Sequence, residues 1–118
     1  MVGNLRGVKE GAERLVAAIE VDADRAVLDL AGEIDMATSG LLDGHLEDVV
    51  DRGAVHVVVD VEHVDFADST FVTALLRARE RVAPLGGSVR VVAPTAPVRR
   101  LLDITGVSTV PGIVVAAT

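Results

Sequence analysis

A short apolar segment, Val55–Asp60, constrains the fold of this 118-residue chain more than any other stretch. It is rich in valine and stands between two segments with helical periodicity, at about 37–52 and 69–82. An apolar strand with a helix before and after it in the chain is typical of a central, buried strand in a parallel sheet. The segment therefore predicts an α/β fold.

The rest of the chain extends this pattern in both directions. We expect a hairpin first, from strands over Arg14–Val21 and Ala26–Ala31. The central strand is followed by a predicted loop over Val61–Asp68 and by the second helix. The remaining predicted elements are a strand over Val89–Ala93, a helix from Pro97 to about Ile104, and a last strand over Val107–Val110 or from Ile113. The predicted order is β-β-α-β-α-β-α-(β), in a mixed, mostly parallel central sheet with helices packed against it.

Composition narrows the classes of partner. Half of the residues are hydrophobic, but only Phe66 and Phe71 are aromatic, so aliphatic side chains must fill the core. The net charge of −7 repels phosphate backbones and anionic lipids, which argues against nucleic acid and membranes as partners. We expect a flexible lead-in over residues 1–11 and a single domain over 12–118.

The chain has no cysteine, which excludes a disulfide framework, a thiolate metal site and a cysteine nucleophile. Its apolar stretches are far shorter than the ~20 residues that span a bilayer. Charges run throughout Met1–Glu20, where a signal peptide would be apolar. We therefore expect a cytoplasmic protein that uses no metal and no cofactor.

The segment Val64–Phe71 carries the most chemical information. It follows the predicted central strand, and the carboxyl edge of a parallel sheet is where ligands usually bind. Asp68 is a good N-cap residue, so Ser69 and Thr70 fall in the first helical turn, where backbone N–H groups are unpaired and partly positive. A phosphate on Ser69 could be accommodated there without unfolding the domain, and its charge of about −1.5 to −2 would change what docks on that surface. The same residues also fit a plain helix start, because Asp-Ser-Thr is a common way to begin a helix.

Three motifs together resemble the STAS family, and within it the small bacterial anti-sigma-factor antagonists. Asp68-Ser69-Thr70-Phe71, preceded by Asp65-Phe66, is similar to the Asp-Ser-Ser/Thr-Gly that opens the second helix of the family. Leu30–Asp35 is similar to its Leu-x-Gly-Glu-hydrophobic-Asp stretch, and Pro97–Gly106 to its third helix with the terminal glycine. The motifs occur in the order and spacing of the family, and the resemblance runs from about Leu15 to Val114.

The resemblance implies a STAS fold and a partner switch that has no active site of its own. In the family, the unphosphorylated antagonist binds an anti-sigma factor, which is a protein serine kinase, and so releases the sigma factor. The kinase phosphorylates the first serine of the motif, the complex separates, and a PP2C-type phosphatase resets the switch. By position the acceptor is Ser69, with Thr70 as the alternative. The free antagonist is expected to be a monomer.

Phe71 departs from the family pattern, which usually has glycine at this position. The side chain is either a partner anchor, since aromatic residues dominate interface hot spots, or a core residue beside Leu75. We favour the anchor. In either case the departure raises the question of whether the chain is still phosphorylated.

The other candidate contacts are mostly acidic. Glu33 and Asp35 follow the second strand and are expected near Ser69, where they either shape the docking surface or only cap the loop and the helix. Asp65 is expected to hold its loop by accepting backbone N–H bonds. The predicted partner-binding set is Glu33, Asp35, Asp68, Ser69, Thr70 and Phe71.

Two other functions compete with the switch. An enzyme could use Asp65 and Asp68 with the nearby His63, but the chain has no cysteine or tyrosine, and its one lysine, Lys9, lies in the lead-in. The stronger alternative is a STAS domain that is no longer phosphorylated and serves as a scaffold or binding module in a signalling complex. Phe71 is the feature that favours this alternative.

Overall fold

The computed structural model describes residues 14–116 and contains one five-stranded sheet in the sequential order β1-β2-β3-β4-β5. β1 (Leu15–Asp22) and β2 (Arg25–Ile34) form an antiparallel hairpin. The strands β2, β3 (His56–Ala67), β4 (Ser88–Val92) and β5 (Ile113–Val115) are parallel. The mixed, mostly parallel sheet and the predicted order of elements are confirmed, including the final strand. The lead-in predicted for 1–11 lies outside the described residues.

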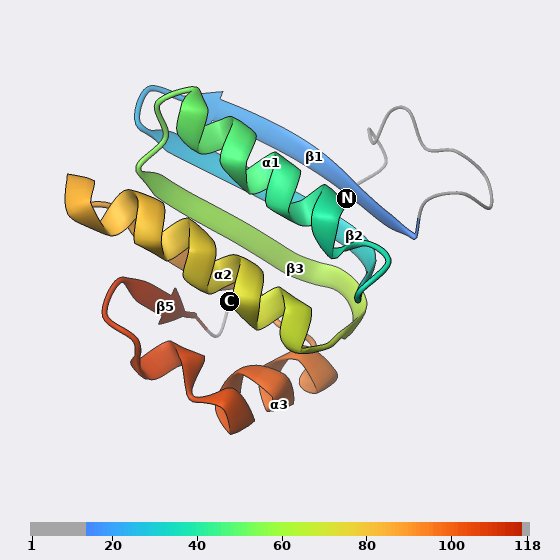
Figure 1. Cartoon of the computed structure of the whole chain (residues 1–118). Coiled ribbons are helices and arrows are strands. Elements are labelled where there is room, and N and C mark those ends of the chain that lie inside the picture. Colours follow the sequence, from blue (N-terminus) through green and yellow to red (C-terminus); the bar gives the residue numbers. More distant parts are fainter. Residues whose placement is uncertain (1–13, 117–118) are drawn as a thin grey trace.

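Each helix connects two neighbouring parallel strands: α1 (Ser39–Asp51), α2 (Ser69–Val82) and α3 (Ala96–Thr105). Short 3-10 helices follow two of them, η1 (Ala83–Leu85) after α2 and η2 (Val107–Thr109) after α3. Figure 1 shows α1 and α2 side by side over one face of the sheet. Because a connecting helix begins where the preceding parallel strand ends, all three helices begin at the carboxyl edge of the sheet.

The core lies between this face of the sheet and the helices. In β2 and β4 the buried residues stand at alternate positions, as the period of two in a strand requires. Each fully buried aliphatic side chain contributes about 1.5–3 kcal/mol through the hydrophobic effect. The buried strand residues include Leu28, Leu30, Val57, Val59, Val61, Val89 and Val91, and the buried helix residues include Leu42, Leu46, Val49, Phe71, Leu75 and Leu102.

The strand β3 is longer than the sequence indicated. The segment 61–68 was predicted to be a loop, but β3 continues to Ala67 beside the end of β2. β4 pairs with β3 only as far as Asp60. Beyond that point the start of α3 takes the place of β4, and Thr95 Oγ1 donates a hydrogen bond to the carbonyl of Val64 at 3.1 Å. The charged residues in this half of the strand face solvent, which is why it lacks an apolar pattern.

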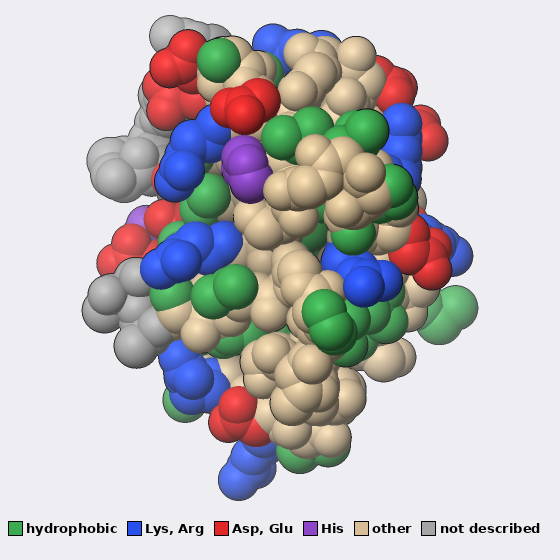
Figure 2. Space-filling view, turned by 90° about the vertical axis from the view of Figure 1, so that its left-hand side faces the viewer, with side chains coloured by type: hydrophobic (Ala, Val, Ile, Leu, Met, Phe, Trp, Pro, Cys, Tyr) green, Lys and Arg blue, Asp and Glu red, His purple; other side chains and the backbone are tan. Residues whose placement is uncertain are grey.

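The end of the molecule at which α1 and α2 finish has no concentration of one residue type in the described part of the chain. Figure 2 shows this end, with basic, acidic and hydrophobic side chains intermixed over it. No helix within residues 14–116 is long and apolar enough to cross a membrane.

Candidate partner-binding site at the start of helix α2

Asp68 fixes the start of α2. Its backbone is extended, with φ −112° and ψ −170°, and its Oδ1 atom accepts a hydrogen bond from the backbone N–H of Thr70 at 2.9 Å. Its carbonyl accepts a hydrogen bond from the N–H of Phe71 at 3.0 Å. The predicted N-cap is therefore confirmed, and such a cap stabilises a helix by about 0.5–2 kcal/mol. Ser69 is held in the first position of the helix as a consequence.

The two hydroxyl groups of the motif have different surroundings. Ser69 is exposed, and its hydroxyl group makes no hydrogen bond with any described residue; only its carbonyl is engaged, by Thr73 Oγ1 at 3.2 Å. Thr70 is half-buried, and its hydroxyl donates to the carboxylate of Asp68. The Ser69 hydroxyl is thus the one that faces solvent without an internal partner.

The end of β2 lies directly beside this helix start. The backbone N–H of Asp68 donates to the carbonyl of Ile34 at 3.0 Å, so Asp35 comes next to the first turn of α2. The Oδ1 atom of Asp35 accepts hydrogen bonds from the N–H groups of Ala37 at 2.9 Å and Thr38 at 3.2 Å. Asp35 therefore holds the turn that leads into α1.

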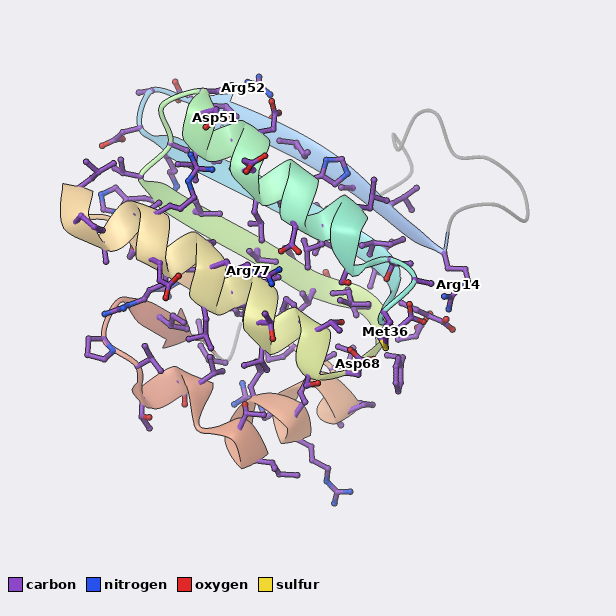
Figure 3. The ribbon with its side chains drawn as sticks, in the orientation of Figure 1. Arg14, Met36, Asp51, Arg52, Asp68 and Arg77 are labelled. Carbon is purple, nitrogen blue, oxygen red and sulfur yellow. The ribbon has the colours of Figure 1, made fainter. Side chains whose placement is uncertain are left out.

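Arg14 binds both carboxylates that were predicted at the end of β2. Its guanidinium group lies 2.7 Å from Asp35 Oδ2 and 2.5 Å from Glu33 Oε1. These hydrogen bonds, above all those from Arg14, hold the pKa of Asp35 below its ordinary value. Because one cation is shared by two carboxylates, the cluster carries a net charge of about −1 rather than −2. Figure 3 shows Arg14 and Asp68 at the same end of the molecule.

The family model described as Mlab, STAS domain matches residues 17–115, a range that includes the end of β2 and the start of α2. The chain belongs to the STAS-domain family. An anti-sigma F factor antagonist of Paenibacillus polymyxa is 31% identical over 91 residues, which cover 75% of this chain and 78% of that protein. This relationship places the chain among the anti-sigma-factor antagonists of the family.

Solved structures agree with this STAS fold. An anti-sigma factor antagonist from Mycobacterium paratuberculosis is 26% identical, with a TM-score of 0.75 over 91% of this chain and 90% of that one. The Bacillus cell fate determinant SpoIIAA in its phosphorylated form is 18% identical, with a TM-score of 0.65 over 86% of this chain and 91% of that one. The second likeness is evidence for the fold alone.

Phe71 is a core residue of this STAS domain, so the partner anchor that we favoured from the sequence is wrong. The side chain is 0% exposed. It belongs to the stripe of α2 that faces the sheet, together with Ala74, Leu75, Ala78 and Val82. The spacing of this stripe is helical, and Phe71 fits it at the i, i+3, i+4 and i+7 positions. Helical periodicity was therefore the signal that could have assigned Phe71 to the core.

The exposed hydrophobic side chains at this edge include Met36 and Phe66, which are 84% and 48% exposed. Phe66 is the last residue but one of β3, three residues before Ser69, and Met36 lies in the turn after β2. A hollow between the starts of α1 and α2 is lined by Met36, Ser39, Asp43, Thr70, Thr73 and Arg77, which places Met36 across from the first turn of α2. The sequence analysis did not select Met36, because a single apolar residue in a turn has no periodic neighbours that mark it.

Asp65 does not have the predicted role. It lies within β3 with an exposed side chain, and no backbone N–H group of the described residues donates to its carboxylate. The loop that it was expected to hold is a strand whose backbone pairs with β2. Of the other residues that an enzyme could use, Asp68 caps α2, and the Nε2 atom of His63 lies 3.8 Å from Oε1 of its neighbour Glu62. Within residues 14–116, no three histidine or acidic side chains are placed to hold a metal ion.

Proposed function

We propose that this STAS domain binds an anti-sigma factor serine kinase when Ser69 is unphosphorylated, and that phosphorylation of Ser69 by this kinase separates the two proteins. Binding of the kinase releases the sigma factor, and a PP2C-type phosphatase resets the switch. The observation that carries the proposal is the exposed Ser69 hydroxyl, without an internal hydrogen bond, at the first position of α2.

The surroundings of the two hydroxyl groups favour Ser69 over Thr70 as the acceptor. A kinase must orient the hydroxyl and remove its proton, which requires a group that it can approach. Ser69 offers such a group, whereas the Thr70 hydroxyl is half-buried and donates to Asp68. Phosphorylation of Thr70 would also disturb the cap of α2, whereas a phosphate on Ser69 leaves the cap intact.

The proposed effect of the phosphate is local and electrostatic. It adds about −1.5 to −2 charges at neutral pH beside the carboxylates of Asp68 and Asp35. The partly positive start of α2 stabilises this charge within the domain. A partner surface shaped for a neutral serine meets a hydrated dianion instead. Binding is therefore lost while the fold is retained.

The test uses the purified chain, its cognate kinase and ATP, with mass spectrometry of the peptide that contains Ser69 and with titration of the complex. We expect phosphate on Ser69, permanent binding by Ser69→Ala, and a loss of affinity of at least tenfold in Ser69→Asp. Ser108→Asp, at an exposed serine of η2, adds the same charge away from α2 and is expected to bind like the wild type. Wild-type affinity in Ser69→Asp would show that charge at this position does not control the complex.

The scaffold alternative remains an outcome of this test. Phe71 is the feature that favours it, because a phenylalanine replaces the usual glycine of the family; its burial shows only that the side chain does not itself contact a partner. Binding of the kinase without any phosphate on Ser69 would identify the chain as a constitutive binding module. Turnover of a small substrate would instead indicate an enzyme.

A further inference from the structure

A second hollow lies beside the start of α2, between the end of β3 and the start of α3. It has a volume of about 440 Å³ and is lined by Phe66, Ala67, Ala96, Pro97 and Arg100. The hollow that Met36 lines is a different one, because it lies between the starts of α1 and α2 and has no residue of α3 in its lining. Because Phe66 and Ala67 directly precede Asp68 and Ser69, this second hollow adjoins the proposed phosphorylation site.

The lining of this hollow is apolar except for one cation. Four of its five residues are hydrophobic or proline, and the Phe66 ring is 48% exposed. An aromatic side chain this exposed gains free energy when a partner covers it, and aromatic residues are enriched at interface hot spots. The guanidinium group of Arg100 stands at the rim on the exposed side of α3. Such a site fits an apolar side chain that has an acidic neighbour.

Arg100 is available to a partner, unlike the four arginines of the described part of the chain that form ion pairs with acidic side chains, Arg14, Arg52, Arg77 and Arg81. Arg77 pairs with Asp43 of α1 at 2.9 Å, and Arg81 pairs with Asp51 at 2.7 Å. Figure 3 shows Arg77 in the gap between α1 and α2. Within residues 14–116, Arg100 forms no ion pair with an acidic side chain. An unpaired cation on a chain of net charge −7 attracts a carboxylate that the rest of the surface repels.

We propose that this hollow is a second docking point for the same anti-sigma factor. Its occupant is a segment of the kinase in which an aliphatic or aromatic side chain enters beside Phe66 and Pro97 and a neighbouring carboxylate binds Arg100. The inference rests on the proposed function, since one partner that covers Ser69 also covers the adjoining hollow. The hollow supplies affinity and selects the partner, while Ser69 controls release.

The test measures the affinity of the unphosphorylated chain for its purified anti-sigma factor kinase by titration calorimetry. We expect Phe66→Ala and Arg100→Glu each to raise the Kd at least tenfold, with the Arg100→Glu effect larger at low salt. The matched control is Arg90→Glu, which reverses an exposed arginine of β4 outside the hollow and should stay within about twofold of wild type. Circular dichroism confirms that each variant is folded.

The outcomes separate the two proposals. If Phe66→Ala and Arg100→Glu bind within twofold of wild type while Ser69→Asp loses affinity, the hollow is not a docking point and the switch stands. Equal losses of affinity in Arg100→Glu and Arg90→Glu would also overturn the proposal that the hollow is a docking point, because only the net charge of the chain would then matter. If the wild-type chain does not bind the kinase, both proposals are wrong.

Discussion

Replacing Phe71 with alanine tests whether this residue belongs to the core. The side chain is 0% exposed on the stripe of α2 that faces the sheet. Truncating a buried phenylalanine removes its transfer free energy and leaves a cavity, so we expect a loss of about 3–5 kcal/mol in the free energy of unfolding. Domains of this size are stable by about 5–15 kcal/mol, so the variant should fold but be markedly weakened.

The assay is urea unfolding followed by far-UV circular dichroism, because the chain has neither tryptophan nor tyrosine to report by fluorescence. If the free energy of unfolding falls by about 1.5 kcal/mol per molar urea, the expected loss lowers the urea concentration at the unfolding midpoint by roughly 2–3 M. Phe66→Ala is the matched control, since it removes the same ring from a position that is 48% exposed. Its midpoint should move by less than about 1 M.

A midpoint shift below about 0.5 M in Phe71→Ala would refute the core assignment, above all if the affinity for the kinase fell instead. Phe71→Gly should have a free energy of unfolding about 1 kcal/mol lower than that of Phe71→Ala, because glycine adds backbone freedom to the unfolded chain. The glycine that is usual in the family therefore cannot simply be restored here. Its place in this chain is filled by a ring on which the core depends.

Three further changes test the edge of the sheet where the site lies. Arg14→Gln should raise the pKa of Asp35, measured by NMR titration, toward its ordinary 3.8. Because the pKa of this carboxyl is lower in the folded than in the unfolded state, its contribution to stability is present above about pH 4 and is lost as the pH falls. The variant should therefore lose less stability than the wild type in acid unfolding. An unchanged pKa would mean that the guanidinium does not set it. Gly32→Ala should lower the free energy of unfolding in urea by about 2–4 kcal/mol, because φ is +116° and the new Cβ would lie 1.9 Å from the Arg14 carbonyl oxygen. Gly44→Ala in α1, where a new Cβ would have nothing within 4 Å, should raise it by about 1 kcal/mol. Equal effects of the two changes would contradict this account. Asp68→Ala should cost about 0.5–2 kcal/mol through loss of the α2 cap, and no change in the urea midpoint would show that the cap contributes nothing.

Local sequence signals were sufficient for the order of elements and for the start of α2. The valines of β3, the helical spacing of α1 and α2, and the Asp68 cap all act over a few residues. Period and capping are properties of the chain within one or two turns, so they can be recognised without the fold. The position of Ser69 at a helix start was predicted for this reason.

The tertiary structure decided which side chains face a partner, because that depends on contacts between residues far apart in sequence. Arg14 reaches Glu33 and Asp35 across the hairpin, 19 and 21 residues away. β3 continues to Ala67 because β2 pairs with it and α3 replaces β4, and none of these partners is visible in the segment itself. The packing of α2 on the sheet then turned Phe71 inward, since only one stripe of a helix can contact a sheet, whereas Phe66 on β3 stayed exposed.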